Sequence, residues 1–229
     1  MIETALLALT LALYWGFRTL QAKVKSPLLN PVLLAIACLV PLLIYCHIPY
    51  ERYMAGGRFI NLFLEPAVVA LAYPLYQQLA LIRAQWKALL VTLLLGVLLA
   101  LTLTVLLAWA LGADKTVALS LAPKAVTTPI AMGVSQKLGG IAPLTAVLVI
   151  LAGIAGAVLG PWILDKAGVK SPEARGLAMG CAAHAVGTAR MVEESPEAAA
   201  FSSLALSLCG ILTALLAPLL VPLLTEWMT

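Results

Sequence analysis

Charged side chains are scarce in this chain. Of its 229 residues, 10% are Asp, Glu, Lys or Arg, whereas 63% are hydrophobic, and the mean hydropathy is +1.05. Because a soluble domain carries about 25% charged residues, this composition argues against a soluble protein and predicts a multi-pass membrane protein. The formal net charge of +4 is expected from basic residues in cytoplasmic loops, so it does not indicate nucleic acid as a partner.

Residue types that carry out catalysis or hold cofactors are also few. The sequence has 4 cysteines and 2 histidines, and the cysteines lie in or beside apolar segments without the spacing of a metal site. His47 and His184 lie in distant segments, and we find no Ser–His–acid set, intramembrane acid pair or cofactor-binding motif. We therefore expect no enzyme activity, no cofactor and no metal.

Long apolar runs are what the sequence does contain. A bilayer core of about 30 Å needs about 20 apolar residues for one helical crossing. The first run follows "MIET", which has an acid where a cleavable signal peptide has positive charge, so we expect it to be a span. The predicted spans are Thr4–Leu20, Pro27–Cys46, Ile60–Ile82, Ala88–Leu111, Pro143–Leu164 and Ala199–Leu224.

Two further apolar segments are interrupted in the middle. They are "TVALSLAPKAVTTPIAMGVSQKLGG", before the fifth span, and "SPEARGLAMGCAAHAVGTARMVEES", before the sixth. In the first, Pro123 removes a helical hydrogen bond, and Thr128 before Pro129 predicts an N-cap followed by proline at the first helical position. In the second, Gly187 and Thr188 are expected to interrupt the helix in the same way, less sharply.

The two interrupted segments are copies of one another. A shift of 60 residues aligns Lys124-Ala-Val-Thr-Thr with His184-Ala-Val-Gly-Thr. A shift of 57 residues continues the match into the next span, where Leu151, Gly153, Ile154, Ala157 and Pro161 fall on Leu208, Gly210, Ile211, Ala214 and Pro218. The repeat unit is therefore an interrupted segment followed by a transmembrane helix, and it occurs twice.

The distribution of basic residues decides between two layouts. If both interrupted segments turn back as hairpins, eight loop Lys and Arg residues share one side and four lie on the other; if both cross, the count is six against six. The positive-inside rule favours hairpins with both termini periplasmic. Successive copies of such a unit have opposite orientations, as in the inverted repeats of secondary transporters.

Five runs from Glu65 onward resemble the LrgB/CidB family of bacterial inner-membrane proteins. They are "EPAVVALAYPLYQQ", "PKAVTTPIAM", "GGIAPLTAVLVILAGIAGAVLGP", "ARGLAMGCAAHAVGTAR" and "FSSLALSLCGILTAL". The resemblance implies one of two functions. One is transport of small monocarboxylates such as pyruvate, glycolate or glycerate, because the plastid glycolate/glycerate translocator contains an LrgB-like part. The other is holin/antiholin-like control of murein hydrolase export and autolysis with a small LrgA/CidA-type partner.

The first interrupted segment has the chemistry of an anion site. Lys124 is costly in a membrane and needs a partner; the nearest acids are Glu65 in the third span and Glu193 and Glu194 beyond the second segment. A cation among hydroxyls suits a carboxylate, and the helices that follow each interruption would add N–H groups and partial positive charge. The predicted substrate-binding residues are Lys124, Thr127, Thr128, His184, Gly187, Thr188 and Arg190.

Each of these residues also has a structural interpretation. Lys124 could neutralise Glu65 or extend to the membrane interface, and Glu65 could simply begin a helix before Pro66. His184 could pack in the core or carry a proton. Arg190 could be a cytoplasmic basic residue or a second clamp on the carboxylate. The sequence leaves these alternatives open.

The resulting prediction is an all-α membrane protein with six spans and two re-entrant hairpins. Residues 1–111 would form a scaffold of four transmembrane helices, and residues 112–229 a transport core with repeats 112–165 and 172–225. We expect a multi-pass protein of the bacterial inner membrane that forms a homo-oligomer. The expected partners are a small carboxylate, a coupling proton or sodium ion, lipid and an LrgA/CidA-type protein.

Overall fold

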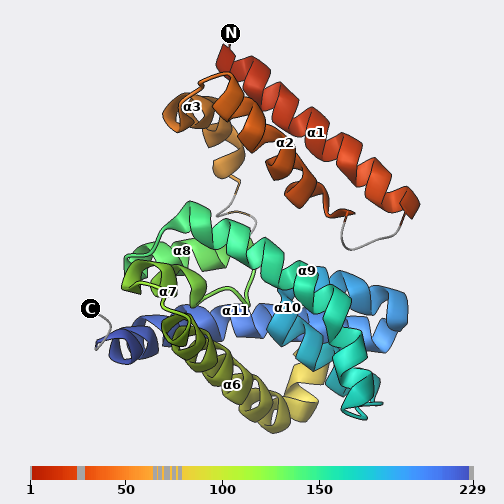
Figure 1. Ribbon diagram of the computed structural model, residues 1–229. Helices are drawn as coiled ribbons and strands as arrows, with labels where there is room; N and C mark the ends of the chain where they lie inside the picture. Colours follow the sequence, from red (N-terminus) through yellow and green to blue (C-terminus); the bar gives the residue numbers. More distant parts are fainter. Residues whose placement is uncertain are drawn as a thin grey trace. The chain divides into compact units, whose positions relative to one another are not determined.

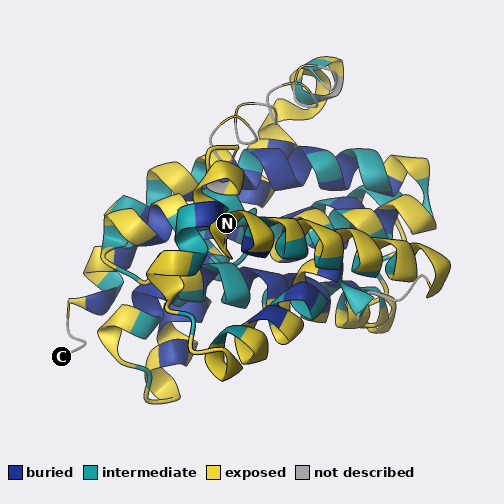
Figure 2. Ribbon diagram, turned by 90° about the horizontal axis from the view of Figure 1, so that it is seen from above, coloured by how far each residue is buried: buried dark blue, intermediate teal, exposed yellow. Residues whose placement is uncertain are grey.

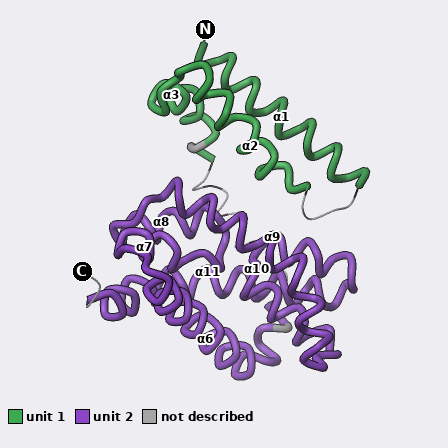
Figure 3. The backbone as a smooth tube through the Cα atoms, viewed as in Figure 1, with its two compact units in different colours: residues 1–67 green, residues 68–229 purple. Residues whose placement is uncertain are grey.

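The computed structural model describes residues 2–24, 29–63, 66, 69, 73, 76 and 79–226, and within these residues it contains helices and no strand. The chain forms two compact units, residues 1–67 and residues 68–229 (Figure 3). Each unit has its own packing and is treated separately. The boundary between these units differs from the predicted boundary at residue 111. The predicted boundary separates a scaffold from a transport core by function, and that functional division stays a prediction.

The first unit is a small helical assembly. Its helices are α1 (Ile2–Val24), α2 (Pro31–Tyr45) and α3 (Tyr50–Asn61). Leu6, Ala35 and Leu39 are buried where α1 meets α2. Helix α3 approaches α1 closely at Gly56, where an added Cβ atom would lie 2.4 Å from the carbonyl oxygen of Glu3.

The early spans are only partly as predicted. Helix α2 has 15 residues and begins at Pro31, because Asn30 caps it through bonds to two backbone N–H groups. It is therefore shorter than the 20 or so residues of a full crossing. Helix α3 was not predicted, because its mixed polar sequence resembles a loop, and Ile60 lies in its last turns rather than at the start of a span. Most of the third predicted span lies outside the described residues.

The second unit contains the spans that the sequence predicted best. Its helices are α6 (Leu79–Ala110), α7 (Lys115–Leu121), α8 (Thr128–Leu138), α9 (Ala142–Lys166), α10 (Pro172–Glu194) and α11 (Pro196–Thr225) (Figure 1). Within the described residues, three stretches are long and apolar enough to cross a membrane: 82–110, 142–166 and 196–225. They correspond to the fourth, fifth and sixth predicted spans.

The core of the second unit lies between α6, α7 and α11. Buried side chains fall on one face of each helix and exposed ones on the other (Figure 2). Leu93, Leu101 and Val105 of α6 pack with Leu204 and Val221 of α11 in one continuous cluster. The outward faces of these helices are apolar as well, as expected where the surroundings are lipid rather than water.

The first interrupted segment, α7 and α8, turns back on itself. Lys115 at the start of α7 and Leu138 at the end of α8 line the same open cavity of about 370 Å³, together with Pro222 and Glu226 at the end of α11. Figure 1 shows α7, α8 and the C-terminal end of α11 side by side. The chain between the two short helices, residues 122–127, therefore forms the tip of a hairpin, which we call the first tip.

Hydroxyl groups hold the open end of the first hairpin together. Thr145 of α9 donates to the Oγ of Ser135, at 2.7 Å, and also lies 3.0 Å from the carbonyl oxygen of Ser120. The N–H of Ile141 donates to Ser120 Oγ at 2.8 Å. All three hydroxyl-bearing side chains are fully buried. These bonds join α7, α8 and the start of α9 in a fixed arrangement.

The second interrupted segment, α10, also turns back. Its helical geometry breaks at Ala183 and His184, where His184 has φ 40° and ψ −136°. Arg175 in its first turns forms an ion pair with Glu194 at its end. In a continuous helix these residues would be about 28 Å apart along the axis, so the two halves of α10 must run side by side. We call residues 183–188 the second tip.

The open ends of the two hairpins lie at opposite ends of α9. The first meets the start of α9 through Thr145, and the second meets its end, where Arg175 bonds Asp165 at 2.7 Å. The breaks also fall at equivalent positions of the 60-residue repeat, because Lys124 corresponds to His184. The geometry is that of two copies in opposite orientations.

Both predicted helix caps are wrong in detail. Thr127, not Thr128, is the N-cap of α8, and its side chain makes no capping bond. Proline fits anywhere in a first turn whose N–H groups lack helical partners, so Pro129 did not fix the cap. In the second segment the break precedes Gly187. The absence of a Cβ atom at Gly187 instead allows the two arms of the hairpin to approach, because a Cβ atom there would lie 2.7 Å from the carbonyl oxygen of Met179.

Candidate functional site

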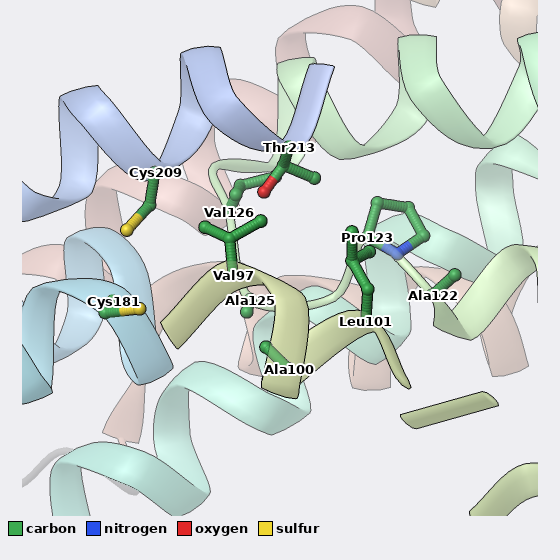
Figure 4. A pocket seen from close by; sticks show the side chains of 10 residues that line it. All are labelled: Val97, Ala100, Leu101, Ala122, Pro123, Ala125, Val126, Cys181, Cys209 and Thr213. Atoms are coloured by element: carbon green, nitrogen blue, oxygen red, sulfur yellow. The ribbon is translucent and has the colours of Figure 1, made fainter. Parts of the chain in front are cut away.

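A small cavity borders the first tip inside the second unit. The first tip and Cys181, two residues before the second break, line a common cavity of about 10 Å³ with residues of α6 and α11 (Figure 4). A cavity of this size has room for about one water molecule. Its lining is Val97, Ala100, Leu101, Ala122, Pro123, Ala125, Val126, Cys181, Cys209 and Thr213. The sequence predicted that both tips face a shared polar cavity; this cavity is mostly apolar, and it borders the first tip but none of residues 183–188, so the shared polar cavity stays a prediction.

Helix α9 contacts both tips. The ring Nε2 of His184 lies 2.8 Å from the carbonyl oxygen of Val149, and Val149 packs in one buried cluster with Val126 of the first tip. Gly153 makes room for the imidazole, because a Cβ atom there would lie 2.5 Å from His184 Cε1. The two tips therefore share Val149 as a common neighbour.

Lys124 is the cation of the first tip. It is half-buried, and among the described residues its side chain has no hydrogen-bond or ion-pair partner. Glu65 lies outside the described residues, so its predicted pairing with Lys124 is not tested. Glu193 and Glu194 were the other predicted partners of Lys124. That prediction is wrong, because Glu193 pairs with Arg190 and Glu194 with Arg175.

Thr127 provides a buried hydroxyl without a partner at the same tip. Its Oγ1 is the one buried side-chain nitrogen or oxygen in the described part of the chain without a hydrogen-bond partner. A buried polar group left unpaired costs about 1–3 kcal/mol. Thr127 stands at the N-terminus of the 11-residue helix α8, where N–H groups are free and the helix dipole favours negative charge. A cation, a hydroxyl without a partner and a helix N-terminus, all within a few residues of one another, have the chemistry that an anion requires.

The polar side chains of the second tip have more hydrogen-bond partners than those of the first. His184 is 3% exposed and bonded to α9, and it holds an unfavourable positive φ. Thr188 bonds the carbonyl oxygen of His184 and the hydroxyl of Ser202, both at 2.9 Å. Arg190 pairs with Glu193 at a half-exposed position; like the other six predicted substrate-binding residues, it does not line the small cavity. Its predicted role as a second carboxylate clamp stays a prediction.

Sequence reasoning missed two features of this region. Thr213 of α11 directs its hydroxyl toward the cavity (Figure 4). A polar residue within an apolar span is a signal from which the sequence could have predicted a place in the site. Arg175, interpreted as a loop cation, is 8% exposed and binds Asp165, Glu194 and the carbonyl oxygen of Val169. Nothing in the sequence places these three groups together, because their contact depends on the hairpin.

The helices and the site define a multi-pass α-helical membrane protein with a paired-tip core. Residues 10–223 match the model of the LrgB-like family, and the chain belongs to that family. It is 42% identical over 90% of both chains to an uncharacterized protein of Haemophilus influenzae. It is 37% identical to the holin-like protein CidB of Staphylococcus epidermidis and 36% identical to that of Staphylococcus aureus, each over 92% of both chains. No solved structure matches the chain.

Proposed function

We propose that this protein transports a small monocarboxylate, such as pyruvate, glycolate or glycerate, across the bacterial inner membrane. The observation that carries the proposal is the buried hydroxyl of Thr127, which has no hydrogen-bond partner among the described residues and stands at a helix N-terminus, three residues after the half-buried cation Lys124. A carboxylate would accept hydrogen bonds from both, and charge-assisted bonds of this kind are among the strongest in proteins. His184 and Thr188 would form the opposite wall of the site.

The layout of the core supports a carrier that alternates between two states. Hairpin tips that meet near the middle of the membrane, in an inverted repeat, are the usual substrate site of secondary transporters. In this layout six spans and two re-entrant hairpins place both termini in the periplasm. The cavity beside the first tip, of about 10 Å³, has no room for a three-carbon acid, so we expect a tip to move before substrate reaches Lys124 and Thr127. We propose a proton or sodium ion as the coupling ion.

A holin-like function is the second candidate, and the names of the relatives favour it. Two relatives at 36–37% identity are named holin-like protein CidB, which fits regulation of murein hydrolase export better than it fits a carboxylate carrier. Under this proposal the chain would work with an LrgA/CidA-type membrane protein or as a homo-oligomer. Its tips would then open a pore instead of holding one substrate.

Uptake into proteoliposomes distinguishes the two. Vesicles with purified protein, with and without an LrgA/CidA-type partner, are given labelled pyruvate, labelled glycolate or labelled glycerol, which is similar in size but neutral. A carrier takes up the carboxylates with saturation and excludes glycerol. A pore passes all three in proportion to concentration. Equal passage without saturation would reject the transport proposal.

A further inference from the structure

An apolar groove runs between α6 and α11, away from the paired tips. It has a volume of about 210 Å³, and among the described residues its lining is entirely hydrophobic. Trp86 and Leu90 of α6 and Ile211 of α11 line it while remaining roughly half exposed. Leu93 and Leu212 form part of its inner wall. In a membrane protein such an open apolar groove has the character of an acyl-chain site.

One end of the groove carries positive charge. The ammonium group of Lys87 lies 5.7 Å from the centre of the Trp86 ring, and Trp86 lines the groove. Arg83 is exposed one turn earlier on α6. Helix α6 departs from helical geometry at Gln85, between the two cations, so Lys87 continues directly into the apolar part of the helix and Arg83 precedes the bend. No acid of the described chain forms an ion pair with Lys87 or Arg83.

We propose that this groove binds one acyl chain of an anionic glycerophospholipid, whose phosphate is held by Lys87 and Arg83. The apolar length accepts the chain, and the two cations match the negative charge. Trp86 stands in the first turns of the apolar stretch 82–110, near the end of a span, where aromatic residues are enriched at the level of lipid headgroups. Basic residues at such positions attract anionic lipid at about a fivefold gain in affinity each. The site is separate from the tips and independent of the transported substrate.

The full-length protein in neutral detergent is titrated with phosphatidylglycerol or phosphatidylcholine while its melting temperature is followed. At tenfold saturation we expect phosphatidylglycerol to raise the melting temperature by about 3–6 °C and phosphatidylcholine to have a clearly smaller effect. Lys87→Gln should weaken the phosphatidylglycerol effect about fivefold in apparent affinity. Lys166→Gln is the matched control, because Lys166 lies 5.9 Å from the Trp162 ring but does not border the groove.

A second pair of variants tests the apolar part. Ile211→Trp should fill the groove and reduce the count of co-purified lipids seen by native mass spectrometry, whereas Leu215→Trp, one turn away and 64% exposed, should not. Equal responses to both lipids, or equal effects of Lys87→Gln and Lys166→Gln, would overturn the proposal. A change of oligomeric mass in Ile211→Trp without loss of lipid would overturn it too, because it would assign the groove to a protein partner.

Discussion

Lys124 and Thr127 show how single residues suggest a function here. A cation and a hydroxyl that find no partner among the described residues are unfavourable in the interior of a membrane protein, so their presence at one helix end suggests a ligand. The sequence predicted Lys124, Thr127 and Thr128 as a group because prolines interrupt the helix there. It could not predict that the Thr127 hydroxyl is left without a partner, since that depends on which neighbours the folded tip supplies.

Removing the cation should weaken anion binding while leaving the fold intact. One charge-assisted hydrogen bond is worth about 1.5–3 kcal/mol, so Lys124→Ala should lower the affinity for pyruvate or glycolate by about ten- to a hundred-fold. Lys124→Arg should retain part of the binding, because the planar guanidinium replaces the compact ammonium imperfectly. Calorimetric titration of detergent-solubilised protein measures both. If Lys124 only neutralises Glu65, the double variant Lys124→Ala with Glu65→Gln will instead recover both stability and binding.

Two threonines provide a matched test of satisfied and unsatisfied hydroxyls. Thr127 makes no hydrogen bond within the part of the chain that the structure describes, so Thr127→Val should leave the melting temperature unchanged or raise it, and should lower anion affinity. Thr145 bonds Ser120 and Ser135, so Thr145→Val should cost about 1–3 kcal/mol of stability. Thermal unfolding of both variants in the same detergent provides the comparison. A destabilised Thr127→Val protein would mean that its hydroxyl has a structural partner.

At the scale of elements, the hairpins are the feature that the sequence anticipated best. The 60-residue repeat and the excess of basic residues on one side both favoured segments that turn back, and the ion pair between Arg175 and Glu194 places the ends of α10 together. The shift of the second break from Gly187 to Ala183 and His184 was not predictable. Alanine is a strong helix former, and the break there is imposed by tertiary contacts such as the bond of His184 to Val149.

The return of α10 can be tested by cross-linking. In a background without the four native cysteines, Arg175→Cys with Glu194→Cys should form a disulfide on mild oxidation. In a continuous helix these positions would be about 28 Å apart, beyond the reach of any disulfide. Arg175→Cys with Ala185→Cys is the control pair and should stay reduced, because residue 185 lies beyond the break. Cross-linking of the control pair alone would contradict the hairpin.

At the scale of the whole molecule, the apolar spans of the second unit were predictable because length and hydropathy define them. The first unit was predicted less well: α3 has a polar sequence that buries few side chains, and α2 is too short to cross a membrane in one helix. The contacts of Arg175 with two acids were not predictable either, because they join residues that only the folded hairpin brings together.

The orientation of the chain follows from the hairpins and the basic loops. We predict that the loop 165–172 is cytoplasmic and that the C-terminus is periplasmic. A single cysteine in place of Lys170, in the background without native cysteines, should resist a membrane-impermeant maleimide in intact spheroplasts and react after permeabilisation. A cysteine added after the last residue should react in intact spheroplasts. Labelling of the Lys170 position from outside would reject the orientation.

Uptake by the wild-type protein and by Lys124→Ala, compared side by side in proteoliposomes, tests the central claim most directly. The two proteins are reconstituted at equal density, and initial rates are measured over a range of labelled pyruvate or glycolate concentrations. The account predicts saturable uptake by the wild-type protein, and a rate at low concentration that is at least tenfold lower for Lys124→Ala. Linear, unselective passage through the wild-type protein, or full activity of Lys124→Ala, would contradict it.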